Sequence, residues 1–400
     1  MTDTRRFTSR LLVPLDGPPI PGGVLEVCGG RISAVFAGPD PSATDLGDLA
    51  LIPGLINAHT HLEFSGLAKP LPAPDGLVPW LRNVVATRGQ RPASANPVRA
   101  GLDELQACGT AAAGDITTEG PASTQSSPGD PSRVVFREII GLRSTLRSAR
   151  LALARDFLAE ERADDCLRGI SPHAPYSVHP DLFGDLVGLA NTHDAPLAIH
   201  LAESPEELLL LANGSGPLRL LLEELDAWED NAIASGSRPL DYLRPLALLS
   251  RPLVIHGNLL DDTELAWLAD HRHVAVVYCP RSHAHFGHPP HPWLQLLETG
   301  TPVILGTDSR ASNPDLSVWN ELQFLSRTTS ALSPTDLLSM ATQAAARALG
   351  LGSNLGSLTP GKKAFAVAVA LPASTPWTLQ SILQSGRIAG SLQNGHWHPA

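Results

Sequence analysis

Short apolar runs alternate with helical stretches through the middle of the chain. The predicted strands are Leu51–Ile56, Thr110–Ala113, Val134–Ile140, Gly169–Ser171, Leu197–His200, Leu253–His256, Val274–Tyr278 and Val303–Gly306. The predicted helices between them include Asn96–Cys108, Ser144–Arg162, Pro180–Thr192, Glu206–Leu222, Asp261–His271 and Pro290–Thr299. Eight such alternations over roughly 300 residues favour an α/β fold with a (β/α)8 TIM-like barrel. A doubly wound sheet is the alternative, but polar residues at nearly every strand's C-terminal end favour the barrel.

Both ends of the chain consist of short apolar or alternating runs bounded by glycine and proline, which predict strands and turns. We expect a small β-sandwich domain built from residues 1–51 and 357–400, around a hydrolase barrel of residues 52–356. A Pro- and Gly-rich insertion over residues 66–96 carries a short amphipathic helix from Leu77 to Val85. Because long insertions after the first barrel strand cover the active-site mouth, we expect this helix there. Residues 212–247, rich in leucine, glycine and serine, form a second insertion.

The charge and cysteine content narrow the class of protein. The net charge of −11 argues against a nucleic-acid or anionic-membrane partner, since both require a basic face. Four widely spaced cysteines predict neither a disulfide framework nor a zinc knuckle (Cys28, Cys108, Cys166 and Cys279). The N-terminus is polar, and no apolar stretch is long enough to span a bilayer. We therefore expect a cytoplasmic protein that acts on a small molecule.

Two histidines one residue apart follow the first apolar run, in Pro53-Gly-Leu-Ile-Asn-Ala-His59-Thr-His61. In an extended segment, residues i and i+2 point to the same side. Both imidazoles therefore leave the strand end on one side, close enough to share a metal ion. This pattern makes metal-dependent hydrolytic chemistry the leading interpretation.

Further ligand-type residues stand at the ends of later strands: His200, His256 and Asp308. A lone histidine at a strand end is more often structural than a ligand. Five ligand-type groups at the same end of successive strands are much harder to attribute to packing, and a buried carboxylate such as Asp308 is costly unless it is paired or bound to a metal. Imidazole and carboxylate ligands suit zinc, with iron as the alternative.

Five short motifs occur in order along the chain. They are Pro53-Gly-Leu-Ile-Asn-Ala-His-Thr-His61, His200-x-x-Glu203, His256-Gly-Asn-Leu, Cys279-Pro-Arg-Ser-His283 and Gly306-Thr-Asp308-Ser. This ordered set resembles the amidohydrolase superfamily, in its branch of aminohydrolases and chlorohydrolases. The resemblance extends over nearly the whole chain, and the combination is highly specific although each motif alone is weak. Most relatives carry asparagine where His283 stands, so this departure bears on specificity.

The resemblance implies one catalytic divalent metal held by His59, His61, His200 and Asp308. Members with two metals usually bridge them with a carboxylated lysine, and no lysine lies between residues 70 and 361. The resemblance also implies that His256 polarises the substrate, that Asp308 accepts a proton from the attacking water, and that Glu203 shuttles protons. The alternative for Glu203 is a helix-capping carboxylate. Dimers are common among relatives, so a homodimer is kept as an option.

Candidate substrate contacts lie on the other strand ends and on the first insertion. His173, in Ser171-Pro-His-Ala-Pro-Tyr176, resembles a substrate-contacting histidine of the family, and a purely structural role is the alternative. Trp80 is either a pocket wall or an anchor for the insertion. Glu138 either reaches substrate or pairs with Arg137 in the scaffold.

The stretch from Arg281 to His291 is rich in histidine. Its position after the seventh strand suggests a substrate-facing loop, in which Arg281 and His283 bind a hydroxyl or a carboxylate. A second metal site is the weaker alternative. We expect His288 and His291 to be exposed to solvent.

Three functions are weighed on these observations. The first is hydrolytic deamination of a heteroaromatic amine by an aminohydrolase. Within the resemblance the leading substrate is an adenosine derivative such as aminodeoxyfutalosine, in menaquinone biosynthesis, followed by S-adenosylhomocysteine, methylthioadenosine or guanine. The second is a chlorohydrolase acting on a carbon–halogen bond, or opening of a cyclic amide. The glutamate of H-x-x-E favours deamination, because an amine leaving group needs protonation and chloride does not. The third is a catalytically silent scaffold, against which the complete ligand set argues.

Overall fold

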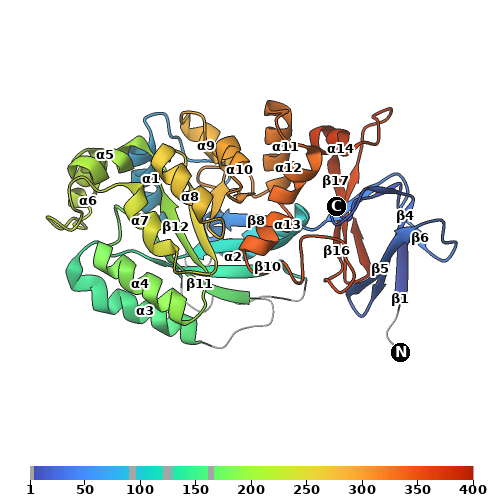
Figure 1. Ribbon diagram of the computed structural model, residues 1–400, viewed down its shortest axis with the longest axis horizontal. Coiled ribbons are helices and arrows are strands. Elements are labelled where there is room, and N and C mark those ends of the chain that lie inside the picture. The colour runs from blue at the N-terminus through green and yellow to red at the C-terminus, as the bar shows by residue number, and fades with distance from the viewer. Residues whose placement is uncertain (1–3, 90–95, 120–126, 128, 161–165, 400) are drawn as a thin grey trace.

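The computed structural model describes residues 4–89, 96–119, 127, 129–160 and 166–399. It shows a strand-and-helix body on one side and two smaller sheets near both termini on the other (Figure 1). The last residues of the helix predicted over Ser144–Arg162 lie outside the described residues. Among the described residues, no helix is long and apolar enough to cross a membrane.

Eight parallel strands form the centre of the larger body and are ordered as they occur in the chain. They are β8 (Leu55–Thr60), β9 (Thr110–Thr117), β10 (Ser132–Ile139), β11 (Cys166–Pro172), β12 (Leu197–Leu201), β13 (Pro252–His256), β14 (Ala275–Tyr278) and β15 (Val303–Leu305). After β15, the backbone N–H groups of Thr307 and Asp308 donate to the His59 carbonyl of β8, both at 3.0 Å. These bonds bring the last strand against the first, and the predicted TIM-like barrel is confirmed.

The helices between the strands match most of the predicted ones. They are α2 (Pro97–Ala107), α3 (Arg147–Ala159), α4 (Pro180–Thr192), α8 (Asp262–Asp270) and α10 (Trp293–Glu298). The single helix predicted over Glu206–Leu222 is wrong, because two helices occur there, α5 (Pro205–Asn213) and α6 (Pro217–Glu224). Gly214 ends α5 in the left-handed region at φ +62° and Pro217 begins α6, which is the usual chemistry of a helix stop and start. Further helices are α7 (Pro239–Leu246), α9 (Pro280–Phe286), α11 (Val318–Thr328), α12 (Pro334–Met340), α13 (Gln343–Ala348) and α14 (Leu379–Ser385).

Two sheets near the termini pack against each other. One has the order β5-β4-β1-β6 and the other β18-β17-β16-β7-β2-β3. Their bounds are β1 (Thr4–Thr8), β2 (Leu11–Leu12), β3 (Ile20–Pro21), β4 (Gly23–Cys28), β5 (Arg31–Ala37), β6 (Thr44–Asp45), β7 (Ala50–Pro53), β16 (Phe365–Ala370), β17 (Arg387–Gln393) and β18 (His396–Pro399). A buried cluster that includes Phe7, Leu25 and Leu392 draws on both sheets.

The run predicted as one strand, Leu51–Ile56, is divided between the two parts of the molecule. β7 pairs with β16 in the terminal sheet, whereas β8 begins the barrel. Gly54 stands between them, where an added Cβ would lie 2.5 Å from the Phe365 ring and 2.6 Å from the Ala111 Cβ. Only glycine fits this close approach. The proposed division of the chain remains a small domain of residues 1–51 with 357–400 and a barrel of residues 52–356. The boundary after residue 51 falls within β7.

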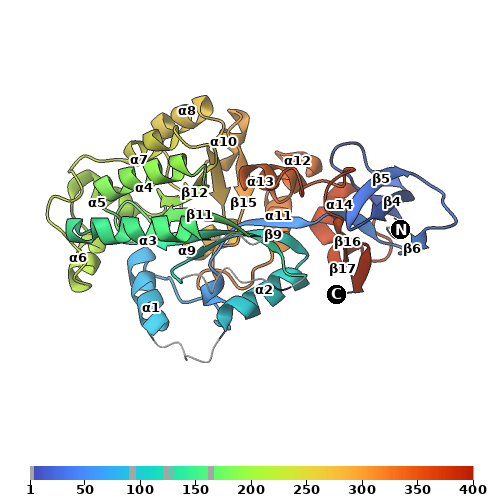
Figure 2. The same cartoon turned by 90° about the horizontal axis from the view of Figure 1, so that it is seen from below.

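The first insertion forms helix α1 (Leu77–Gly89), at the end of the barrel away from the terminal sheets (Figure 2). An ion pair between Arg82 and Glu224, with N···O 2.9 Å, joins α1 to the end of α6. The two insertions that were separate in the sequence therefore lie side by side.

Candidate metal centre

The two closely spaced histidines lie at the C-terminal end of β8, as their spacing predicts. His59 is the penultimate residue of the strand, and His61 precedes a short 3-10 helix over Leu62–Phe64. Their ring centroids are 4.9 Å apart. Both side chains are buried, so bulk solvent does not supply hydrogen bonds to both nitrogens of either imidazole.

Three groups from later strands converge on the same point. The ring centroids of His200 and His256 lie 5.1 and 5.7 Å from that of His59. Asp308 Oδ1 lies 3.4 Å from His59 Nε2 and 3.8 Å from His61 Nε2. Among the described residues, the ligand atoms of His59, His61 and Asp308 lie within 4.8 Å of one another, and so do those of His59, His200 and His256. Residues up to 249 positions apart in sequence thus form one ligand cluster.

The protonation states fit a divalent metal. Burial lowers the pKa of His61, His200 and His256 well below the ordinary 6.5, so these imidazoles are neutral and offer lone pairs. Both ring nitrogens of His59 and Nδ1 of His61 are buried without a hydrogen-bond partner. Buried polar atoms of this kind need an explanation, and a bound cation supplies one for the atoms that face it.

Two of the candidate ligands, His200 and Asp308, are oriented by hydrogen bonds to their outer atoms. His200 Nδ1–H donates to the His173 carbonyl at 3.0 Å, which leaves Nε2 as the free lone pair. Asp308 Oδ2 accepts hydrogen bonds from the hydroxyls of Ser282 and Ser312, so Oδ1 faces the histidines. The residues present therefore fit a single metal held by three imidazoles and one carboxylate, the donor set of zinc or iron.

The backbone is strained at two positions of the cluster. His256 has φ +68° and Asp308 has φ +58°, in the left-handed region that residues with a Cβ rarely adopt. Such conformations persist only where surrounding structure enforces them, and they concentrate at functional sites. The strain supports a functional rather than a packing role for these two residues.

Glu203 lies beside the ligand cluster. Its Oε1 is 3.5 Å from His256 Nε2, and its side chain is almost fully buried. Burial, followed by the negative charge of Asp308, raises the pKa of Glu203 well above the ordinary 4.5, which favours the protonated form of the carboxyl. The alternative, a helix cap, belongs to other residues: Ser204 caps α5 by accepting from the Glu207 N–H.

Glu207 fixes the backbone that carries Glu203. Its two carboxylate oxygens accept the N–H groups of Ala202 and Glu203, each at 2.9 Å. Ala202 is held at φ +52°. Glu207 is not among the site residues predicted from sequence, although the pattern Ser204-x-x-Glu207 before an apolar run indicates the start of a helix.

A pocket opens beside the cluster, and its lining includes three of the predicted substrate contacts: Trp80, Glu138 and His173. Trp80 is both wall and anchor, because its Nε1–H donates to the Ala311 carbonyl at 3.0 Å. His173 Nδ1 lies 2.6 Å from Ser177 Oγ, and its Nε2 is 4.0 Å from Glu138 Oε1. Glu138 itself pairs with Arg88 of α1 at 3.4 Å.

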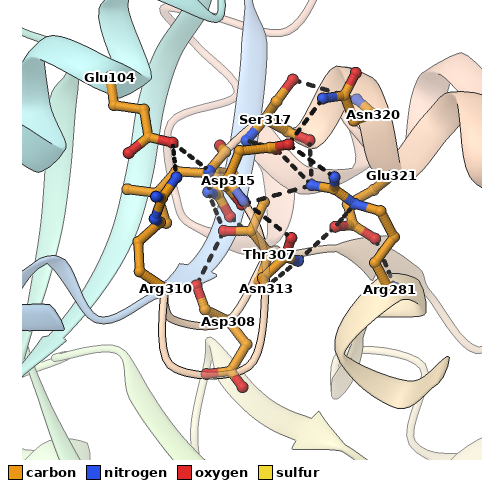
Figure 3. Close-up of polar contacts among 12 residues, drawn as sticks. Glu104, Arg281, Thr307, Asp308, Arg310, Asn313, Asp315, Ser317, Asn320 and Glu321 are labelled. Atoms are coloured by element: carbon orange, nitrogen blue, oxygen red, sulfur yellow. Dashed lines mark hydrogen bonds and ion pairs between the residues drawn. The ribbon is translucent and has the colours of Figure 1, made fainter. Parts of the chain in front are cut away.

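Two other predicted contacts have different surroundings. Arg281 is bound in a network behind the Asp308 loop (Figure 3): its guanidinium reaches both oxygens of Asp315, at 2.9 and 2.6 Å, and Glu321 at 2.7 Å. His283 Nε2–H donates to the Pro289 carbonyl at 2.9 Å. Neither residue is among the described residues that line the pocket. That Arg281 and His283 contact substrate stays a prediction, which their positions outside this lining do not favour.

The expectation that His291 is exposed is wrong. Its side chain is buried, with 7% exposed, and its Nε2–H donates to the His256 carbonyl at 2.7 Å. The residue supports the strained backbone of a cluster member. His288, by contrast, is half-buried.

Several residues of the site escaped sequence reasoning. They are Glu63, Arg88, Glu207, Ser282, Ser312 and the leucines of α6 that line the pocket. Ser282 and Ser312 stand within or next to motifs already noted in the sequence. No sequence pattern indicates Glu63 and Arg88, because their ion pair, with N···O 2.5 Å, forms only in the folded chain.

The sequence matches the amidohydrolase family over residues 50–397. A 5-methylthioadenosine/S-adenosylhomocysteine deaminase of Syntrophobacter fumaroxidans is 30% identical, over 88% of this chain and 81% of the relative. An aminodeoxyfutalosine deaminase of Deinococcus radiodurans is also 30% identical, over 85% of this chain and 84% of the relative.

Solved structures share the fold. An aminofutalosine deaminase of Helicobacter pylori, in complex with methylthio-coformycin, superposes with a TM-score of 0.82 at 20% identity, covering 98% of this chain and 99% of the other. An adenosine deaminase of Xanthomonas campestris with bound zinc superposes with a TM-score of 0.76 at 23% identity, covering 98% of this chain and 92% of the other.

Proposed function

The chain belongs to the amidohydrolase family of metal-dependent hydrolases that act on C–N bonds, and on that premise we propose that it is a hydrolytic deaminase of an adenosine derivative. The observation that carries the proposal is the position of the buried Glu203 carboxyl, 3.5 Å from His256 and beside a cluster of imidazoles and one carboxylate. Deamination needs one proton at the ring nitrogen during attack and another on the amine that leaves as ammonia, and a carboxyl at this place can shuttle protons between such groups.

The metal would be held by His59, His61, His200 and Asp308, with zinc proposed and iron as the alternative. A divalent ion there would supply a Lewis acid that makes water nucleophilic at neutral pH. The remaining work belongs to the chain's own groups.

Each of those groups has a position that suits its proposed role. Asp308 Oδ1 faces the cluster and accepts the proton lost by the attacking water, while its Oδ2 stays bound to two serine hydroxyls. Glu203 gives its proton to the ring nitrogen beside the carbon under attack. The proton held by Asp308 is then relayed to the exocyclic amine, whose bond to that carbon breaks as ammonia leaves, and the proton of the added hydroxyl returns to Glu203 as the carbonyl forms. His256, 3.5 Å from Glu203, donates a hydrogen bond to the oxygen added at that carbon. Acid–base steps of this kind contribute about 10²- to 10⁴-fold.

For the substrate we propose aminodeoxyfutalosine, with methylthioadenosine, S-adenosylhomocysteine and guanine as alternatives. Relatives named for the first three match at 30% identity, so sequence similarity alone does not order them. Trp80, Glu138 and His173 are the proposed substrate contacts, because all three line the pocket beside the metal ligands. We also propose that the protein is cytoplasmic and allow for a homodimer.

A chlorohydrolase is the second candidate function. It would need the same metal ligands but no proton for its leaving group, so Glu203 would then be dispensable. Release of ammonia rather than chloride separates the two reactions.

The test uses purified protein with its metal content measured and restored. The panel contains aminodeoxyfutalosine, methylthioadenosine, S-adenosylhomocysteine, adenosine and guanine, and ammonia release is followed for each. We expect deamination of at least one adenosine derivative, and a rate lower by about 10²- to 10⁴-fold for Glu203→Gln, which retains the candidate metal ligands. A protein that binds no stoichiometric metal, or that releases no ammonia from any of these compounds, would refute the proposal.

A further inference from the structure

The helix α6 presents an apolar face to the pocket. Leu218, Leu221 and Leu222 of the helix, and Leu225, which caps its C-terminal end, all line it. Their spacing of i, i+3, i+4 and i+7 places them on one side of the helix. Leu218, Leu221 and Leu222 are buried in the main hydrophobic core, and the same face also borders the cavity beside the candidate metal ligands.

The helix α1 supplies a matching face opposite. Trp80, Leu81, Val84 and Val85 line the same pocket, again with helical spacing, and Ile140 at the end of β10 adjoins them. The ion pair between the two helices keeps these faces together. The walls of the pocket away from the metal ligands are therefore built from large aliphatic and aromatic side chains.

This apolar surface remains partly open. Val85 is 45% exposed, Leu225 is 46% exposed and Ile140 is 38% exposed, although each is a large hydrophobic residue. These are three of only six such exposed residues in the described part of the chain. Their gathering around one pocket, rather than scattering over the surface, marks a place where an apolar group binds.

Charge is scarce in this part of the pocket. Among the described lining residues, the one basic side chain other than histidine is Arg88. Its guanidinium lies 2.5 Å from Glu63 and 3.4 Å from Glu138, so two carboxylates already neutralise it. Arg82 and Glu224 belong to the same helices but pair with each other outside the lining. No described lining residue thus offers a free cation to a carboxylate buried there.

We propose that the faces of α1 and α6 form a subsite for an uncharged alkyl or aryl substituent of the substrate. On an adenosine derivative whose amino-bearing ring lies at the metal, this is the substituent on the 5′ carbon, the part farthest from the reacting ring. The inference rests on the proposed function and narrows its substrate class. It favours a methylthio, alkylthio or aryl group and disfavours the zwitterionic tail of S-adenosylhomocysteine, whose charges would be desolvated without partners. The aryl body of aminodeoxyfutalosine suits the subsite if its carboxylate reaches water at the mouth.

The first test is a substrate series on the metal-replete enzyme. The compounds are 5′-deoxyadenosine, 5′-methylthioadenosine, 5′-propylthioadenosine, 5′-phenylthioadenosine and S-adenosylhomocysteine. Each added methylene that enters the subsite should raise kcat/KM about fourfold. S-adenosylhomocysteine should fall well below the propylthio compound, which has a similar length and no charge.

The second test moves a charge into the subsite. Leu225→Arg places a cation at its mouth and, because Leu225 is already exposed, should leave the fold intact. We expect kcat/KM to fall at least fivefold for the propylthio compound and to rise for S-adenosylhomocysteine. Leu220→Arg is the matched control: Leu220 lies on α6, whose C-terminal end Leu225 caps, is 58% exposed and does not line the pocket. Its substrate preference should equal that of the wild type.

The outcomes separate this inference from the proposed function. If none of the compounds releases ammonia, the proposed function fails. If 5′-deoxyadenosine is deaminated but kcat/KM is flat or falls along the alkyl series, or S-adenosylhomocysteine is preferred, the enzyme is a deaminase and the apolar subsite is refuted. If Leu220→Arg changes the preference as much as Leu225→Arg, the assignment to this helix face is wrong.

Discussion

Replacing Arg281 by methionine distinguishes a substrate contact from a scaffold residue. The sequence placed Arg281 on a substrate-facing loop, whereas the structure places it between Asp315 and Glu321 (Figure 3). Glu321 is 0% exposed and also accepts the Arg281 backbone N–H at 2.9 Å and the Asn313 amide at 2.7 Å. Methionine keeps most of the side-chain volume and removes the charge.

The expected loss of folding free energy follows from the Glu321 carboxylate, which remains buried when Arg281 is removed. Burial raises the pKa of Glu321 and the Arg281 charge opposes this, so without Arg281 the carboxylate stays in the interior unneutralised. Breaking a buried ion pair in this way costs about 3–5 kcal/mol. Asp315 is more exposed and adds less. Arg281→Lys should lose less than Arg281→Met, because lysine keeps the charge but cannot bond both carboxylates at once.

The assay combines urea unfolding with steady-state kinetics on the metal-replete variants. The free energy of unfolding should fall by about 3–5 kcal/mol in Arg281→Met, and adding Glu321→Gln should recover much of that loss. The KM of the remaining active enzyme should change little. Arg272→Met, at an exposed arginine, is the control and should stay within about 0.5 kcal/mol of wild type. If Arg281→Met instead keeps its stability and raises KM tenfold or more, Arg281 contacts substrate and the scaffold argument is wrong.

Three further outcomes are expected. Glu203→Gln should retain metal and fold but lose about 10²- to 10⁴-fold in kcat, and near-normal turnover would remove Glu203 from proton transfer. His200→Ala should lose stoichiometric metal by elemental analysis; full occupancy would exclude it as a ligand. Burial raises the pKa of Glu207 from 4.5 to about 7, so the folded state holds a proton that the unfolded chain has released, and wild-type stability falls as pH rises across that window. Glu207→Gln lacks this titration, although its amide nitrogen cannot accept the second backbone N–H. Whatever its offset from wild type at pH 5, the difference in unfolding free energy should move by about 2–3 kcal/mol in its favour between pH 5 and 8 in urea unfolding, whereas parallel pH profiles would contradict the buried carboxylate.

The barrel and the ligand cluster were accessible from the sequence because both follow from local patterns. Eight alternations of apolar strands and helices favour a barrel, and they do so without reference to the particular apolar residues in each strand. The parallel strands of a barrel bring all their C-terminal ends to one face. His59, His61, His200, His256 and Asp308 therefore had to meet once the strands were recognised. The same reasoning identified Glu203, which follows one of those strand ends.

Only the tertiary structure decided which charges pair and which apolar faces stay open. Arg88 meets Glu63, and Arg281 meets Glu321, through folding that no spacing rule encodes. The leucines of α6 show a helical period in the sequence, but that period is the same whether the face packs into a core or lines a cavity. The period specifies a side of the helix, while the neighbour on that side is set by distant segments of the chain, here the helix α1.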